Sequence, residues 1–181
     1  MQEELQDLDD AALARRTRAG ALECFEVLVA RYETRLYEFL RHRTGNRHDA
    51  EDLTQETFVR AYRQLARYDE RRAFAPWLFT LARRLAASHV RGVRVMDPLP
   101  DNLTAGTEPG TPLAEAEERQ RLWRLVRERL SDDQFTALWL KYAEDMSVRD
   151  MARVMGKMQV HVKVLLHRGR RALRRAMEET R

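Results

Sequence analysis

The stretch SVRDMARVMGKMQVHVKVLLHRGRRAL, residues 147–173, contains two helical patterns separated by a short turn. Ser147 is suited to cap the first helix and Gly156 to end it. The second helix is expected from about Gln159 to Met177, with an inward side made of Val162, Leu166, Gly169 and Leu173. A short capped helix, a glycine turn and an amphipathic second helix are typical of a helix-turn-helix, whose second helix lies in a DNA major groove.

The charges of this stretch fit the same interpretation. Between Asp150 and Glu178 the chain has eight basic residues and no acidic one. A run of one sign attracts the phosphates of nucleic acid. The alternative is a solvated basic helix end that is stabilised by the helix dipole. The turn pattern and the basic run together favour DNA binding.

The pattern of the whole chain predicts an all-α protein. It consists of two small helical bundles, the second of which contains the helix-turn-helix. Four of the five prolines lie within residues 98–112, so residues 92–113 are predicted to form a flexible linker rich in Pro and Gly. The linker separates a first domain, residues 1–91, from a second domain, residues 114–181. In the second domain, further helices are expected at 113–129 and after Ser131, which forms a capping-box pattern with Gln134.

Four helices are expected in residues 1–91. They run from Leu8 to Ala19, from about Phe25 to a break at residues 44–46, from about Arg47 to Leu65, and from about Phe74 to Val93. The inward candidates of the third helix are Ala50, Leu53, Phe58, Ala61, Tyr62 and Leu65.

Composition excludes several classes of protein. The chain has 181 residues and a single cysteine, which rules out a disulfide scaffold or a cysteine-rich zinc site and fits a reducing cytoplasm. No apolar run approaches the roughly 20 residues of a membrane span, and the acidic N-terminus is unlike a signal peptide. Cys24 lies in an apolar stripe and is expected to pack there. His42 and His48 lack a third ligand, so we expect neither a metal nor another cofactor.

A second basic patch runs from Arg71 to Met96, with six arginines, His89 and no acidic residue. Three aromatic residues, Phe74, Trp77 and Phe79, lie within it. Basic residues follow a backbone while aromatic rings stack on unpaired bases, so the patch suits single-stranded or melted DNA. The alternative is that the apolar residues form the core, and for Trp77 the pattern leaves both open.

The third constellation is HDAEDLTQETFVRAYR, residues 48–63. Asp49, Asp52 and Glu56 recur at three- and four-residue steps, with Gln55 beside them, so they share one helical face. Paired carboxylates suit acid–base or metal chemistry, but the face suits a basic protein partner equally well. Neither periodicity nor charge decides between these uses.

Taken together and in this order, the segments resemble bacterial RNA polymerase sigma factors of the extracytoplasmic-function, sigma-70-like group. DAEDLTQETFVRAY (49–62) is similar to their core-polymerase-binding segment, and FAPWLFTLARRLAASHVR (74–91) to their promoter-melting and −10 helix. Residues 130–177 resemble their −35 helix-turn-helix domain, and GALECFEVLVARY (20–32) the opening of their first domain. The resemblance implies a cytoplasmic, non-catalytic transcription initiation factor that binds core RNA polymerase, duplex and melted promoter DNA, and an anti-sigma factor.

The resemblance also implies a role for particular residues. The polymerase-binding residues would be Asp49, Asp52, Gln55, Glu56 and Arg60. The residues at the −10 element would be Arg72, Trp77, Arg83, Arg84, Ser88, His89 and Arg91. The residues at the −35 element would be Arg149, Gln159, His161, Lys163, Val164, His167, Arg168 and Arg171.

The chain departs from the family pattern at several of these positions. Arg84 and Ser88 stand where the −10 helix usually has Asn and Asp, and Met158 stands at the usual serine cap of the recognition helix. Because Val162 is inward, Val164 should point about 160° away, toward a thymine methyl in the groove or toward a protein partner. The departures leave open a sigma-like adaptor with weakened promoter recognition. An enzyme acting through the 49–56 carboxylates is disfavoured because the chain has no phosphate loop and no nucleophile–base pair.

Overall fold

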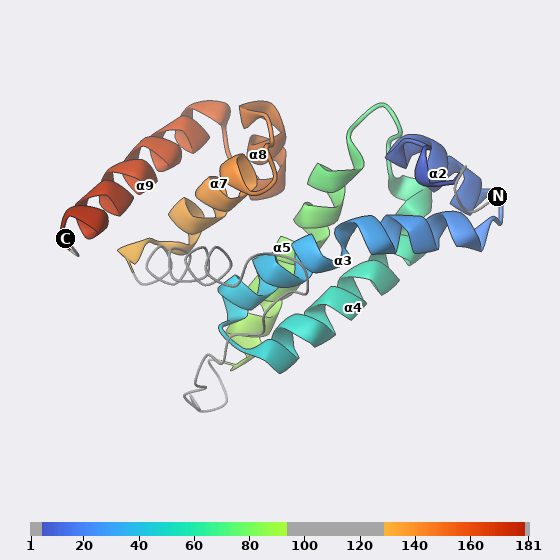
Figure 1. Cartoon of the computed structure of the whole chain (residues 1–181), viewed down its shortest axis with the longest axis horizontal. Helices are drawn as coiled ribbons and strands as arrows, with labels where there is room; N and C mark the ends of the chain where they lie inside the picture. Colours follow the sequence, from blue (N-terminus) through green and yellow to red (C-terminus); the bar gives the residue numbers. More distant parts are fainter. Residues whose placement is uncertain (1–4, 94–128, 180–181) are drawn as a thin grey trace. The chain divides into compact units, whose positions relative to one another are not determined.

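The computed structural model describes residues 5–93 and 129–179, and all regular structure in that part of the chain is helical. The chain divides into two compact units. The first contains α2 (Asp10–Arg18), α3 (Leu22–Thr44), α4 (Arg47–Gln64), the 3₁₀ helix η1 (Leu65–Arg67) and α5 (Phe74–Val93) (Figure 1). The second contains α7 (Asp132–Tyr142), α8 (Val148–Met155) and α9 (Gln159–Glu179). The predicted linker at 92–113 and helix at 113–129 lie outside the described residues, apart from their ends.

The predicted break after the long helix is a tight connection between α3 and α4. Gly45 takes the left-handed conformation, with φ 75°, which glycine adopts without a steric penalty. Asn46 then caps the next helix, because its side-chain oxygen accepts a hydrogen bond from the Asp49 backbone N–H at 3.2 Å. Since only two residues separate the helices, α3 and α4 pack directly against each other.

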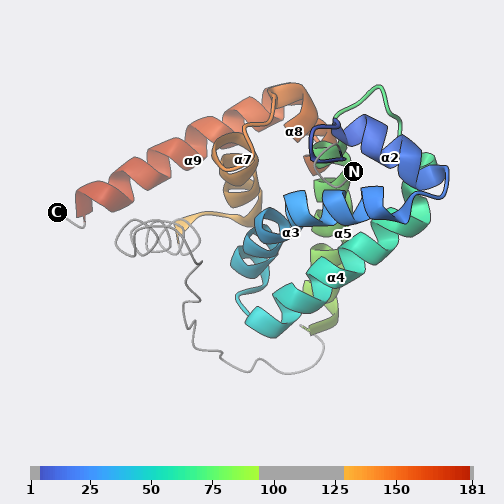
Figure 2. The same ribbon diagram turned by 45° about the vertical axis from the view of Figure 1, so that its right-hand side comes forward.

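The core of the first unit lies between α3, α4 and α5, which lie side by side in Figures 1 and 2. Its fully buried large side chains include Leu28, Leu36, Phe39, Leu40, Phe74, Leu78 and Phe79. Cys24 is buried among them, as predicted. The prediction for Tyr62 was wrong: the residue is 50% exposed, although its ring packs at an angle against the ring of Phe25, with centroids 5.2 Å apart. An amphipathic tyrosine can satisfy helical periodicity from the rim of a core.

Polar contacts attach α2 to the first unit. The Asp10 carboxylate accepts hydrogen bonds from Arg31 Nη1, at 2.8 Å, and from the Tyr32 hydroxyl. Burial, together with the hydrogen bond to Asp10 and the charge of that residue, raises the pKa of Tyr32, so its hydroxyl stays a donor. Helix α2 also packs against α3 and η1.

The described part of the second unit contains the three helices that the sequence predicts after Ser131. Ser131 and Gln134 form the capping box of α7, and the Ser147 side chain accepts a hydrogen bond from the Asp150 N–H at 3.1 Å to cap α8. Met151, Val154 and Val162 are almost fully buried between the helices. Leu173, predicted to be inward, is only half-buried.

Candidate functional site

Helices α8 and α9 form a helix-turn-helix. Gly156 ends α8 in the left-handed conformation, with φ 63°, and α9 begins three residues later. The turn is held to α7 by an ion pair between Lys157 Nζ and Asp133 Oδ2, which are 2.8 Å apart. Gly169 allows α9 to approach α7 closely, because a Cβ at this position would lie 3.2 Å from Leu138 Cδ1. The second helix is therefore held rigidly by its inward side.

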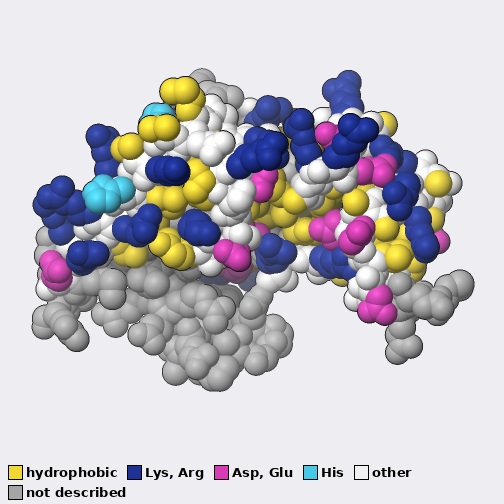
Figure 3. Space-filling view, turned by 90° about the horizontal axis from the view of Figure 1, so that it is seen from above, with side chains coloured by type: hydrophobic (Ala, Val, Ile, Leu, Met, Phe, Trp, Pro, Cys, Tyr) yellow, Lys and Arg dark blue, Asp and Glu magenta, His cyan; other side chains and the backbone are white. Residues whose placement is uncertain are grey.

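The outward side of α9 has two chemically different parts. Val160, Val164, His167 and Arg171 share one face, since they are spaced at i, i+4, i+7 and i+11. Val160 is 71% and Val164 is 39% exposed, so the N-terminal part of this face is apolar. The C-terminal part is basic, and acidic residues are absent from the helix before Glu178. Figure 3 shows Lys and Arg side chains over this helix, with hydrophobic and histidine side chains among them.

The other predicted residues of this interface are also on the surface. Their side chains are exposed at Arg149, Gln159, His161, Lys163 and Arg168. Met158, noted above at the cap position of the recognition helix, is 77% exposed, and the exposed Val160 was not among the predicted residues. Helical spacing from Val164 would have identified Val160 as outward. Of the basic run, Lys157 and Arg153 form ion pairs with acidic residues, the latter with Asp150 at 3.0 Å.

Helix α4 presents the predicted acidic face. Asp52 and Gln55 are exposed, while Leu53 and Phe58 are buried on the other side of the helix. The Glu56 carboxylate accepts a hydrogen bond from Arg60 Nε at 2.6 Å. Val59, which is 42% exposed, lies within the same arc and was not predicted. The face therefore combines carboxylates with an apolar side chain, a combination that suits binding to another protein.

The predicted residues of the second basic patch lie on more than one side of helix α5. Positions 77, 84, 88 and 91 fall on one face by helical spacing, and the side chains of Arg84 and Ser88 are exposed. Trp77 is half-buried and packs on Tyr68 and Phe74, with ring centroids 5.3 and 5.4 Å away. Its ring is thus held in place while part of it stays accessible. Arg83 is half-buried on a different side of the helix, and Arg72 lies in the loop before it.

Two residues that the sequence analysis gave to different surfaces meet in the structure. His89 Nε2 of α5 lies 3.0 Å from Asp49 Oδ2 of α4, and both side chains are 31% exposed. The contact is an ion pair when His89 is protonated. It joins the acidic face of α4 to the basic patch of α5.

The part of the chain that the structure describes shows neither a candidate metal site nor a membrane-spanning helix. Residues 5–93 and 129–179 contain no group of three His, Cys, Asp or Glu side chains that could hold a metal ion. None of the described helices is both long and apolar enough to cross a membrane.

Comparisons with known proteins assign both units. Residues 28–94 match the family described as sigma-70 region 2, and residues 120–173 match sigma-70, region 4. The ECF RNA polymerase sigma factor BldN of Streptomyces coelicolor is 32% identical over 92% of this chain, which spans 65% of the length of BldN. The ECF RNA polymerase sigma factor SigM of Bacillus subtilis is 31% identical over 79% of this chain and 88% of its own length.

The fold is found in a solved structure of the sigma factor RpoE in complex with the anti-sigma factor NepR, from Bartonella quintana. The similarity has a TM-score of 0.72 at 22% identity and covers 87% of this chain and 98% of the other. Two region models in the expected order, and relatives above 30% identity along most of their length, determine the family. The chain is a sigma factor of the extracytoplasmic-function (ECF) group of the sigma-70 family, a non-enzymatic protein that directs RNA polymerase to begin transcription at particular promoters.

Proposed function

We propose that the two units divide promoter recognition between them. Residues 1–91 bind core polymerase and recognise and open the −10 element, and residues 114–181 hold the −35 duplex. The order of the region 2 and region 4 matches supports this division. Residues 92–113 connect the two domains; nearly all of them lie outside the described part of the chain. Because polymerase and promoter DNA are its partners, the chain acts in the cytoplasm.

The observation that carries the proposal is the outward side of α9. Its basic residues are exposed and belong to the second helix of a helix-turn-helix, which is the element that enters the major groove. The −35 residues are Arg149, Gln159, His161, Lys163, Val164, His167, Arg168 and Arg171. Lys163, Arg168 and Arg171 neutralise phosphates, while the first turns of the helix meet base edges.

The −10 surface is formed by α5 and the loop before it. Trp77 is partly accessible within a fixed aromatic cluster, so it can stack on an unpaired base without losing much side-chain entropy. The surface consists of Arg72, Trp77, Arg83, Arg84, Ser88, His89 and Arg91. Arginines around an aromatic ring suit a strand that has been separated from its partner.

The polymerase surface is formed by α4, through Asp49, Asp52, Gln55, Glu56 and Arg60. Exposed carboxylates beside the exposed Val59 support binding to a basic protein surface with an apolar component. The carboxylates of Asp49 and Glu56 already have basic neighbours, so Asp52 is the acidic residue most available to the partner.

Run-off transcription with core polymerase tests the proposal. We expect initiation at a promoter selected from randomised −10 and −35 sequences. Binding to polymerase without initiation at any selected promoter would instead favour an adaptor. That second function has one specific observation in its favour, the exposed apolar residues Met158, Val160 and Val164, which could bind a protein. An anti-sigma factor is a further proposed partner, supported by the complex of the structurally similar RpoE with NepR.

A further inference from the structure

The loop at residues 68–73 connects η1 to α5 and carries Arg71 and Arg72 toward the proposed −10 surface. Three contacts fix the loop internally. The Tyr68 hydroxyl donates a hydrogen bond to the Arg72 carbonyl at 2.5 Å, and Asp69 Oδ1 accepts one from the Arg71 backbone N–H at 3.1 Å. Asp69 also pairs with the Arg72 guanidinium, whose Nε lies 3.1 Å away. The shape of the loop is therefore set by its own residues.

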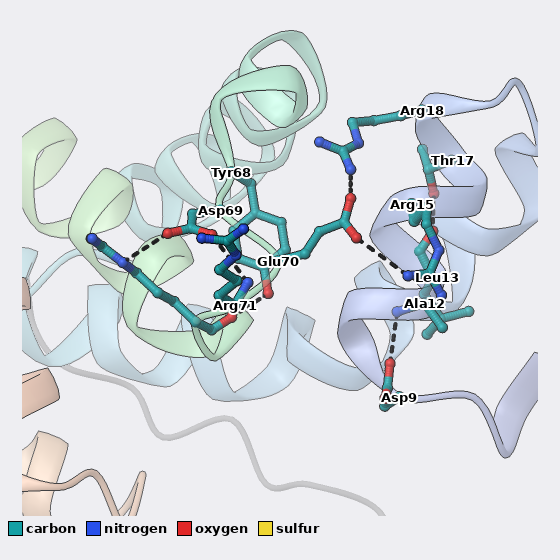
Figure 4. A network of polar contacts seen from close by, with 11 residues as sticks. Asp9, Ala12, Leu13, Arg15, Thr17, Arg18, Tyr68, Asp69, Glu70 and Arg71 are labelled. Atoms are coloured by element: carbon teal, nitrogen blue, oxygen red, sulfur yellow. Dashed lines mark hydrogen bonds and ion pairs between the residues drawn. The ribbon is translucent and has the colours of Figure 1, made fainter.

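The position of the loop depends on a different element. Glu70 points away from the loop toward α2, where its carboxylate lies between two arginines (Figure 4). Glu70 Oε2 is 3.4 Å from Arg15 Nη1, and Glu70 Oε1 contacts Arg18 Nη2. The Glu70 side chain is 25% exposed and that of Arg18 is 32% exposed, so solvent screens this ion pair less than it would on an open surface. The Arg15 side chain is 65% exposed, so its ion pair with Glu70 is the weaker of the two.

Helix α2 is itself anchored, so it can act as a fixed support. Asp9 caps it, accepting a hydrogen bond from the Ala12 N–H at 2.7 Å. Asp10 joins it to Arg31 and Tyr32 of α3. The helix lies outside residues 28–94, the part of the chain that matches sigma-70 region 2. That match alone assigns no role to α2.

The loop also adjoins the aromatic cluster of the −10 surface. Tyr68 is buried and its ring lies 5.3 Å from the rings of both Phe74 and Trp77. A displacement of the loop at Glu70 would therefore move Tyr68 and the ring on which an unpaired base is proposed to stack. The geometry of the −10 surface depends on the distance between the loop and α2.

We propose that Glu70 is a positioning residue for −10 recognition, which it controls by holding the 68–73 loop against Arg15 and Arg18 of α2. The proposal rests on the −10 function assigned above to α5 and its preceding loop. Glu70 itself does not contact DNA. Its charge is directed to α2, which also prevents an acidic group from repelling the phosphates near Arg71 and Arg72.

The test is in vitro transcription by the complete holoenzyme from a promoter library randomised across the −10 element, followed by sequencing of the transcripts. Glu70→Arg should reduce discrimination at one or more −10 positions about fivefold. That factor corresponds to about 1 kcal/mol, the upper end for a partly exposed ion pair. Adding Arg18→Glu should restore most of the discrimination, because the charges are then exchanged. The −35 preferences and the affinity for polymerase should stay unchanged.

Glu26→Arg is the matched control, since Glu26 is an exposed acidic residue of α3 that forms no ion pair in the described part of the chain. Glu70→Gln, checked by thermal unfolding, covers the case in which the charge reversal does not fold. Unchanged −10 preferences in folded Glu70 variants would overturn the proposal. An equal loss of transcription at all promoters, or a charge-exchanged double variant that does not regain −10 discrimination, would also overturn it. If Trp77→Ala also leaves the −10 preferences unchanged, the function assigned to α5 is wrong, and the role of Glu70 is refuted with it.

Discussion

Replacing thymine by deoxyuridine within a −35 element removes only the C5 methyl group, and this tests the apolar part of α9. Val160 and Val164 have no hydrogen-bonding groups, and the thymine methyl is the apolar group that base pairs present in the major groove. If α9 lies in the groove, one thymine should contact Val164. Replacing that thymine by deoxyuridine should then weaken holoenzyme binding.

The expected size follows from the surface that Val164 still exposes. Complete burial of a valine contributes about 1.5–3 kcal/mol, and 39% of this side chain remains exposed. Covering that remainder completely contributes about 0.6–1.2 kcal/mol, so loss of the one methyl group that meets it should weaken binding by at most about three- to sevenfold. Val160 exposes 71% of its surface and should show a larger effect at a second thymine.

The assay titrates holoenzyme on a selected promoter in which each −35 thymine is replaced in turn, with the wild type and with Val164→Ser. The variant should lose the preference for one methyl group and keep the others. Leu22→Ser is the control, because Leu22 is an apolar residue that is 51% exposed but lies on α3, outside the assigned surfaces. If no methyl group matters to the wild type, while Val164→Ser abolishes binding to a protein partner, the groove assignment is wrong and the adaptor function is favoured.

Four further outcomes are expected. The double variant Asp52→Arg with Glu56→Arg should lose polymerase binding in a pull-down. Circular dichroism should show unchanged helicity, because both carboxylates lie on the surface. Binding of this variant to polymerase at full strength would refute the assigned face. The segment 114–181, with a net charge of +5, should bind duplex DNA weakly. The logarithm of the association constant should fall with the logarithm of the salt concentration, with a slope of about −0.9 for each phosphate contacted. An association constant that does not depend on salt would mean that the basic helix is only solvated. Gly169→Ala should destabilise the second unit by about 1 kcal/mol in urea unfolding, since overpacking against Leu138 outweighs the gain in helix propensity. Burial and the nearby acidic charges raise the pKa of Tyr68 from 10.0 to about 12. Its contribution to the free energy of unfolding is therefore complete below pH 10 and falls as the pH rises toward 12. In unfolding experiments, Tyr68→Phe should lack this loss of stability between pH 10 and 12.

Local signals in the sequence were enough to predict the α-helices that the structure describes. The capping residues Ser131 and Ser147 and the left-handed Gly156 act within a few residues of their own position, so the sequence reveals them. Val164 is exposed and Val162 buried, as helical periodicity predicts. The same periodicity failed for Tyr62, because it gives a direction around the helix and not the depth at which the core ends.

Contacts between distant elements could not be predicted in this way. Glu70 is 52 residues from Arg18, and His89 is 40 residues from Asp49, and no sequence period connects such positions. Charge patterns in the sequence assign Asp49 and His89 to separate surfaces, because each pattern concerns one segment alone. Only the packing of α5 on α4 shows that the two surfaces share a pair of side chains.

The ion pairs between Glu70 and α2 have a consequence for the construction of chimeric sigma factors. A designer who wishes to transfer −10 specificity would cut the chain at the limits of the matched region, residues 28–94. That cut takes Glu70 from one parent and Arg15 and Arg18 from the other, so the donor loop meets an unrelated helix. The exchangeable module is discontinuous: it comprises α2 together with the loop and α5, and a transplant should carry all three or restore the two arginines in the recipient.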